Sequence, residues 1–146
     1  MRVCLDTCII IDYLQHREPF FENAHKLFLA VANRIVEGCI TSKSVADIYY
    51  LMHQVLHDNE KVRNILGVLL SLFTILDTTE IDCRRALLSN INDYEDAMMV
   101  ETAERYNIKC IVTRNLKDFV GAKVQAVLPN DFILLLKTQN KPLANK

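Results

Sequence analysis

The sequence has little of what interrupts regular structure. Only three glycines and three prolines occur among 146 residues, so we expect helices and strands to follow one another with few irregular segments. No internal repeat, low-complexity block or linker-like stretch divides the chain. These absences indicate a single domain, long enough to bury a core without disulfides or a structural metal.

The sequence also lacks a strong net charge and a long hydrophobic run. Seventeen basic and eighteen acidic residues give a formal net charge of −1, so any binding of nucleic acid needs a local basic patch or a metal ion. No window holds 18 uninterrupted apolar residues, and Asp6 interrupts the apolar stretch MRVCLDTCIII. We therefore expect neither a transmembrane helix nor a signal peptide, and no association with a membrane.

Cysteines are few and scattered. There are five, at positions 4, 8, 39, 83 and 110, and this odd number at irregular spacing argues against a disulfide framework. Cys4, Cys39 and Cys110 lie inside short apolar runs and are expected to be small core residues. This usage of cysteine favours a reducing, cytoplasmic setting.

What the sequence does contain is an alternation of short apolar runs with helical patterns. Strands are expected at residues 2–5, 39–41, 73–76, 109–113 and 124–127. Helices are expected at 7–14, 19–37, 42–57, 58–71, 79–89, 93–106 and from 130 through DFILLLK, with Gly38 ending the second helix and Asn92 capping the sixth.

This alternation is typical of one fold class. It predicts an α/β, Rossmann-like, three-layer α/β/α architecture with a mostly parallel sheet of roughly five strands. The single domain is expected over residues 1–137, followed by a polar, flexible tail over 138–146.

Acidic and amide side chains lie just beyond the predicted strands. Asp6 follows the first strand, Asp47 lies on the helix after the second, and Asp96 is near the start of the helix before the fourth. Asn115 and Asp118 follow the fourth strand in TRNLKDF. Ligands of open α/β sheets bind outside the carboxyl ends of the strands, so these side chains are expected to converge at one edge of the sheet.

Asp96 stands where an apolar side chain is expected. Met99 and Ala103 mark one face of its helix, and Asp96 falls on the same face at spacings of three and seven residues. A carboxylate on a buried face needs a partner. That partner is either a metal ion or, as the alternative, a salt bridge to Arg105 or Arg114.

A gathering of carboxylates favours a divalent cation. Such groups repel one another and become partly neutral unless a cation lies between them. Mg²⁺ prefers oxygen ligands and keeps several of its waters. Because a bound Mg²⁺ or Mn²⁺ activates water and offsets phosphate charge, the acids predict a metal-dependent phosphodiesterase.

Four motifs occur in an order that resembles the PIN domain (PilT N-terminus) family. They are VCLDTCIIIDYL, TSKSVADIYYL, NDYEDAMMVETA and CIVTRNLKDF, and the resemblance extends from residue 2 to about 136. It implies a ribonuclease that uses Mg²⁺ or Mn²⁺ to cleave single-stranded RNA. Many members of the family are the toxin half of a toxin–antitoxin pair, so the resemblance also implies a small antitoxin partner.

The resemblance assigns a role to each polar position near the strand ends. The metal ligands that it implies are Asp6, Asp47, Asp96 and Asp118, and the further catalytic positions are Thr113 and Asn115. The family more often has Glu in place of Asp47 and Asp in place of Asn115. The second departure leaves three alternatives open: a second metal is bound more weakly, Asp118 takes over as fourth ligand, or the chain is a PIN-like module that binds RNA or a protein without cutting.

Simpler interpretations exist for the same acids. Asp6 and Asp118 can cap the turns that follow them. Asp47 points away from the main apolar face of its helix, which favours a solvent-exposed acid unless that side meets a cleft or a dimer interface. Asp93 either assists Asp96 as an outer-shell ligand or merely favours the helix N-terminus.

Basic residues near these loops are sparse. Lys43, Arg114 and Lys117 either hold a phosphate backbone beside the metal or are ordinary surface charges. The helix KSVADIYYLMHQVL is apolar around most of its circumference. Such a helix indicates a buried interface, most simply a homodimer.

Overall fold

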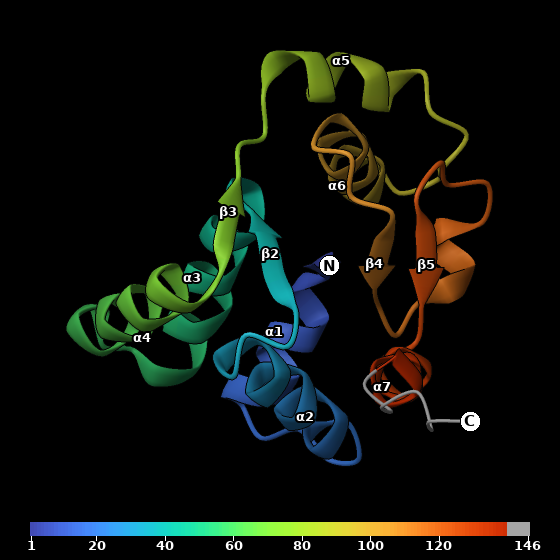
Figure 1. Cartoon of the computed structure of the whole chain (residues 1–146). Helices are drawn as coiled ribbons and strands as arrows, with labels where there is room; N and C mark the ends of the chain where they lie inside the picture. The colour runs from blue at the N-terminus through green and yellow to red at the C-terminus, as the bar shows by residue number, and fades with distance from the viewer. Residues whose placement is uncertain (140–146) are drawn as a thin grey trace, which may run out of the picture.

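The computed structural model describes residues 1–139, in which five parallel strands form one sheet with helices on both faces (Figure 1). The strands are β1 (Arg2–Leu5), β2 (Glu37–Thr41), β3 (Thr74–Leu76), β4 (Cys110–Val112) and β5 (Gln125–Val127). Their order is β3-β2-β1-β4-β5, and every neighbouring pair is parallel. The predicted α/β class with a parallel sheet is confirmed.

The helices occupy the segments between the strands and the segment after the last strand, and they pack in two layers. They are α1 (Thr7–Leu14), α2 (Phe21–Ala32), α3 (Ser42–Leu56), α4 (Asn59–Leu72), α5 (Glu80–Leu87), α6 (Tyr94–Arg105), α7 (Pro129–Gln139) and the short 3₁₀ helix η1 (Leu116–Phe119). One hydrophobic cluster joins α1, α2, α3, α4 and α7 to one face of the sheet, and a second joins α5 and α6 to the other.

The strand sequences explain how the sheet contributes side chains to the hydrophobic clusters on both of its faces. Val3 and Leu5 belong to the first cluster, whereas Cys4 between them belongs to the second. Successive side chains of a strand point to opposite faces. A strand buried on both faces is therefore a continuous apolar run, which is why these runs are recognisable in the sequence.

Gly38 has a different role from the one predicted. The second helix ends at Ala32, and Gly38 lies inside β2. A Cβ at Gly38 would lie 2.6 Å from Val31 Cγ2 and 2.8 Å from Phe73 Cε1. The prediction that Gly38 ends the helix was wrong because glycine is also used where a strand and its neighbours approach closely.

Asp93, rather than Asn92, caps α6. The Asp93 carboxylate accepts a hydrogen bond from the backbone N–H of Asp96 at 3.0 Å. Asn and Asp are nearly equal as N-caps, so the sequence alone did not distinguish the two positions. The cap places Asp96 in the first turn of α6.

The C-terminal helix is longer than predicted. Helix α7 begins at Pro129, a favoured first position of a helix, and continues through Gln139. Residues 138 and 139, which were expected in the tail, are thus helical, and the rest of that predicted tail lies outside the described residues. Across residues 1–139, every helix is too short or too polar to cross a lipid bilayer.

The register of the central strands brings distant residues to one edge of the sheet. Leu5 pairs with Val112, and the backbone N–H of Asp6 donates to the carbonyl oxygen of Val112 at 3.0 Å. Strand β2 runs beside β1 and leads directly into α3 at Ser42. The residues that follow β1, β2 and β4 are therefore neighbours at the carboxyl ends of the strands.

Candidate metal and phosphate site

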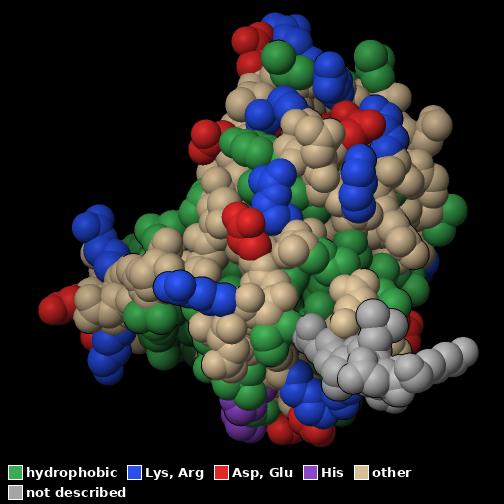
Figure 2. Space-filling model, in the orientation of Figure 1, with side chains coloured by type: hydrophobic (Ala, Val, Ile, Leu, Met, Phe, Trp, Pro, Cys, Tyr) green, Lys and Arg blue, Asp and Glu red, His purple; other side chains and the backbone are tan. Residues whose placement is uncertain are grey.

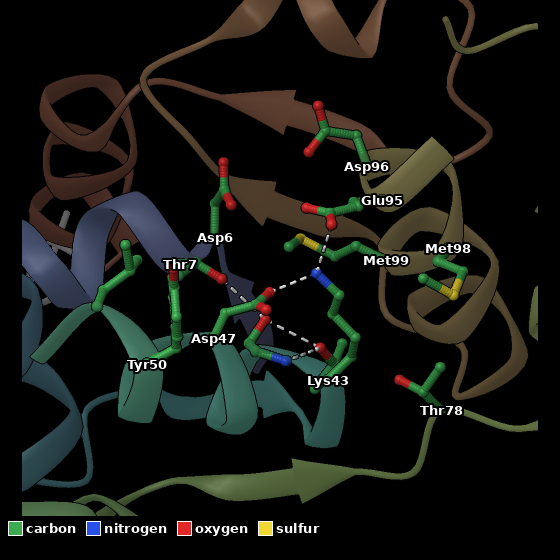
Figure 3. A pocket seen from close by; sticks show the side chains of 13 residues that line it. Asp6, Thr7, Lys43, Asp47, Tyr50, Thr78, Glu95, Asp96, Met98 and Met99 are labelled. Atoms are coloured by element: carbon green, nitrogen blue, oxygen red, sulfur yellow. Dashed lines mark hydrogen bonds and ion pairs between the residues drawn. The ribbon is translucent and has the colours of Figure 1, made fainter. Parts of the chain in front are cut away.

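A pocket of about 360 Å³ opens at this edge between α3 and α6 (Figure 3). Most of its lining comes from the residues that follow β1, from the first turns of α3 and from the first turns of α6. Its acids are Asp6, Asp47, Glu95 and Asp96, and Lys43 lies among them. Three of the predicted metal ligands thus share one pocket.

Asp6 is held in place by the end of β4. Its side chain is buried, with 7% exposed, and its Oδ2 accepts hydrogen bonds from Thr113 Oγ1 at 2.8 Å and from Cys8 Sγ at 3.5 Å. Thr113 Oγ1 in turn accepts from the backbone N–H of Asn115 at 3.0 Å. Burial raises the pKa of Asp6, although the hydrogen bonds from Thr113 and Cys8 oppose the rise.

Asp96 is half-buried and faces other negative charges. Burial raises the pKa of its carboxyl group to about 7, and the charges of Asp6, Asp93 and Asp118 contribute to the rise. Among residues 1–139, no hydrogen bond or ion pair reaches the Asp96 side chain. A carboxylate in this position favours a cation beside it.

Both arginines considered as partners of Asp96 are bound elsewhere. Arg114 donates to both carboxylate oxygens of Asp12, at 2.6 and 3.2 Å. Arg105 donates to both oxygens of Asp82, at 2.9 and 2.8 Å. The alternative of a salt bridge to Asp96 was therefore wrong, and Arg114, a predicted phosphate contact, has its guanidinium engaged outside the pocket.

Asp47 lines the pocket rather than facing open solvent. Lys43 Nζ lies 2.5 Å from Asp47 Oδ2 and 3.1 Å from Glu95 Oε1, so it links α3 to α6 (Figure 3). Burial lowers the pKa of Lys43, but the two carboxylates outweigh this effect and raise it above its usual value. The lysine therefore remains charged.

Glu95 was missed by the sequence reasoning. Helical periodicity placed it on the solvent side of α6, and 69% of its side chain is indeed exposed. Its carboxylate nevertheless turns back to Lys43 across the pocket. No sequence signal marks this contact, because it joins two helices about 50 residues apart whose approach depends on the whole fold.

A small cluster of hydroxyl groups also went unnoticed. Thr7 Oγ1 and Thr41 Oγ1 donate to Ser44 Oγ at 3.0 and 2.9 Å, and Thr41 Oγ1 caps α3 by accepting from the backbone N–H of Ser44 at 3.1 Å. All three residues line the pocket. Together they connect the end of β1 to the start of α3.

The predicted fourth-ligand region lies beside the pocket rather than in its lining. Asn115 is exposed, and its backbone supports Thr113. Asp118 is partly buried in η1, near enough for its charge to raise the pKa of Asp96. Lys117 is exposed in the same 3₁₀ helix.

The arrangement fits a hydrated divalent ion. Over the described part of the chain, no three His, Cys, Asp or Glu side chains stand close enough to hold a metal by themselves. Mg²⁺, however, is commonly held by one or two carboxylates and several waters. Asp6 and Asp96 supply such a pair, and an ion between them would relieve the repulsion that raises the pKa of Asp96.

A parallel sheet of this order, with an acidic pocket at the carboxyl ends of its strands, defines the class of open α/β domains whose ligands bind at that edge. The chain belongs to the PIN domain family, whose model matches residues 2–117. This match confirms the resemblance of the four motifs. PIN domains are generally nucleases and generally use divalent metals.

Several solved structures are similar in fold. VapBC2 from Rickettsia felis, bound to a DNA fragment from its promoter, is 20% identical with a TM-score of 0.65, covering 88% of this chain and 98% of that one. A toxin–antitoxin complex from Klebsiella pneumoniae is 22% identical with a TM-score of 0.64, covering 87% and 97%.

FitAcB from Neisseria gonorrhoeae is similar as well, at 21% identity and a TM-score of 0.64, covering 87% of this chain and 97% of that chain. At these identities the likeness is one of fold. A comparison with curated proteins gave no match.

Proposed function

We propose that the chain is a Mg²⁺- or Mn²⁺-dependent endoribonuclease that cleaves single-stranded RNA and acts as the toxin of a toxin–antitoxin pair. One observation carries the activity: buried Asp6 and half-buried Asp96 share a pocket, and the pKa of Asp96 is raised to about 7 by burial and by neighbouring acids. Membership of the PIN domain family supports hydrolysis of phosphodiester bonds.

Asp6 and Asp96 would hold the metal ion. When bound, the ion lowers the pKa of an attacking water and offsets the charge of the phosphodiester. The Thr113 hydroxyl, 2.8 Å from Asp6 Oδ2, fixes the direction of that carboxylate. Asp118 adds negative charge near Asp96 and, since Asn115 cannot be ionised, is the remaining acid after β4 available to the ion.

Other polar groups position the substrate and the ligands. The Asp93 carboxylate caps α6 and fixes the first turn, where Asp96 lies. Lys43 forms an ion pair with Asp47 and lines the same pocket as the acids. Lys43 and Lys117 are the proposed phosphate contacts, whereas Arg114 is left out because Asp12 holds its guanidinium.

The proposed partners are an antitoxin and a second copy of the chain. A solved structure of similar fold, from Klebsiella pneumoniae, is a toxin–antitoxin complex. Apolar side chains, among them Tyr50, Val55 and Val68, are exposed on the pair of helices α3 and α4, which form the arm at the left of Figures 1 and 2. Exposed apolar side chains gathered on one arm favour burial against another protein.

Cleavage of a fluorescent single-stranded RNA with and without Mg²⁺ or Mn²⁺ tests the activity. We expect Asp96→Asn to lower the rate by about 100-fold. Asp131→Asn, which changes an exposed acid in the first turn of α7, serves as the control and should leave the rate unchanged. Equal cleavage by Asp96→Asn would count against the assigned site.

The same preparation tests the alternative of a module that binds without cutting. Its signature is an RNA mobility shift by the wild-type chain with no cleavage in either metal. That result would favour the loss of activity through Asn115, where the family often has an acid.

A further inference from the structure

Lys43 places a positive charge inside an acidic pocket. Its Nζ lies 2.5 Å from Asp47 Oδ2 and 3.1 Å from Glu95 Oε1, and only 28% of its side chain is exposed. It stands in the first turn of α3, where the helix dipole disfavours a cation. The two carboxylates, and not the dipole of α3, therefore stabilise the ammonium group in the pocket.

The four acids of the pocket divide into two pairs. Asp47 and Glu95 share the ammonium group of Lys43, as Figure 3 shows by the two dashed lines at the lysine nitrogen. Asp6 and Asp96 form the other pair, and within residues 1–139 neither has an ion pair with a lysine or arginine. Lys43 thus pairs with one half of the pocket. Arg114, which forms its ion pair with Asp12, lowers the pKa of Asp6 through its charge but forms no ion pair with it, so Asp6 and Asp96 are left without a bound cation in the described part of the chain.

A two-metal nuclease uses a pair of ions about 3.5–4 Å apart to stabilise the attacking and the leaving oxygen. In this pocket Lys43 occupies an oxygen of each carboxylate that a second ion would need. A second divalent ion would have to displace the ammonium group or lie close to its charge, and like charges at short range repel strongly in a partly buried site.

We propose that the Lys43 ammonium group takes the place of one of two divalent ions, so that the pocket binds a single ion at Asp6 and Asp96 while Lys43 presents the second positive charge to the substrate phosphate. This inference rests on the proposed function and specifies its metal stoichiometry. An ammonium group has three N–H donors. Asp47 and Glu95 accept two of them, which leaves the third for a phosphate oxygen.

The first test is the number of Mn²⁺ ions bound by the full chain, measured by isothermal titration calorimetry and by the electron paramagnetic resonance signal of free Mn²⁺. We expect a single ion for wild type and for Lys43→Arg, which keeps the charge. Lys43→Met leaves Asp47 and Glu95 without their cation and is expected to gain a second ion.

Lys26→Gln is the matched control, because Lys26 forms the same i,i+4 type of ion pair with Glu22 on the surface of α2. It should bind a single ion and keep the wild-type rate. Thermal unfolding and circular dichroism establish that each variant is folded, and Lys43→Gln serves as a second uncharged variant if Lys43→Met does not fold.

RNA cleavage provides an independent measurement. At a Mn²⁺ concentration that fills the Asp6 and Asp96 site but not the second site expected in Lys43→Met, we expect Lys43→Met to lower kcat by about 10–100-fold, and Lys43→Arg to retain activity within about 10-fold. Such a fall in kcat would make Lys43 a catalytic residue. If the ion pairs of Lys43 were only structural, kcat of the folded variant would be unchanged.

The outcomes separate this inference from the function on which it rests. Two ions in wild type, or a single ion in folded Lys43→Met or Lys43→Gln, would overturn the inference while metal-dependent cleavage by wild type leaves the nuclease intact. Absence of both Mn²⁺ binding and cleavage in wild type would overturn the nuclease itself and the inference with it.

Discussion

The pocket holds the carboxyl group of Asp96 in an environment that disfavours its charged form. Asp96 has no positive partner among the described side chains, and the acids around it raise its pKa to about 7. An unfolded chain exposes the same carboxyl group to water, where its pKa is about 3.9. The folded state therefore binds a proton that the unfolded state does not, and its stability depends on pH.

This difference predicts that Asp96→Asn stabilises the metal-free protein at alkaline pH. The stabilisation that Asp96 provides when protonated is complete below about pH 4 and is lost as the pH rises to about 7. At pH 8 in EDTA we expect the variant to exceed wild type by about 1 kcal/mol, after allowance for solvent screening of a half-buried group.

Thermal unfolding at pH 8 and pH 4 measures this effect. The advantage of Asp96→Asn should shrink at pH 4, whereas Asp131→Asn, which removes an acid that the N-terminus of α7 favours, should not exceed wild type at either value. A variant less stable than wild type at pH 8 would contradict the interpretation of Asp96 as an uncompensated acid.

Thr113 is predicted to act through Asp6. Thr113→Val keeps the shape of the side chain but removes the hydroxyl that donates to Asp6 Oδ2 at 2.8 Å. We expect Mn²⁺ affinity to fall about 10-fold, the lower end of the range for groups that orient a metal ligand. Thr113→Ser should restore most of the affinity in the same calorimetric titration, and equal affinity for the Val and Ser variants would argue against this role.

At the scale of elements, Gly38 shows how closely β2 packs against its neighbours. A Cβ there would meet Val31 Cγ2 at 2.6 Å and Phe73 at 2.8 Å. Gly38→Ala is therefore expected to destabilise the protein by about 1–3 kcal/mol through overpacking. Gly67 in α4 has no atom within 4 Å of its missing Cβ, so Gly67→Ala should stabilise it by about 0.5–1 kcal/mol.

Urea unfolding of the two glycine variants gives the comparison directly. Opposite shifts of the midpoint are expected, because one site lacks room for a methyl group and the other gains only helix propensity. A similar midpoint for both variants would show that the β2 contact relaxes readily.

Helices α5 and α6 are joined by a buried ion pair. Asp82 is fully buried and accepts from Arg105 at 2.9 and 2.8 Å and from the Thr102 hydroxyl at 3.0 Å. Burial acts to raise the pKa of Asp82, but these hydrogen bonds and that from the Thr79 N–H outweigh it and hold the pKa below its usual value. The ionised form is thus stabilised by the fold.

Asp82→Asn is expected to cost about 3 kcal/mol at pH 7, since it leaves Arg105 without its partner. Because the pKa is lowered in the folded state, the contribution of Asp82 is present above about pH 4 and is lost as the pH falls further. The deficit of the variant should therefore shrink toward pH 2 in urea unfolding experiments, and a deficit independent of pH would contradict this account.

At the scale of the whole molecule, the proposed metal binding is expected to be linked to folding. An ion that binds only the native pocket stabilises the chain by about 2.7 kcal/mol at 100 times its dissociation constant. We expect Mn²⁺ to raise the unfolding temperature of wild type in a concentration-dependent way and to leave that of Asp96→Asn unchanged. An equal rise in both proteins would place the ion elsewhere.

The charged side chains of the surface are mixed in sign. On the face that Figure 2 shows, basic and acidic side chains are interspersed, in keeping with the net charge of −1. We therefore expect the attraction in the proposed RNA binding to be local to the pocket, where Lys43 and the proposed ion lie. The expected salt dependence of RNA binding is modest, because few phosphates are neutralised.

The sequence by itself determined the strands, their parallel arrangement and the candidates for the acidic pocket. Strands buried on both faces appear as short apolar runs, and acids placed just beyond such runs lie at the carboxyl edge of the sheet. Helix ends were less certain, as Gly38 and Asn92 show, because the same residue types serve as caps, stops and close contacts.

Only the tertiary structure decided which charges meet. Asp12 and Asp82 captured the two arginines that were alternative partners of Asp96, and Glu95 turned back to Lys43 across the pocket. Periodicity describes one helix at a time, whereas these contacts depend on the distance and direction between elements that the packing of two cores sets.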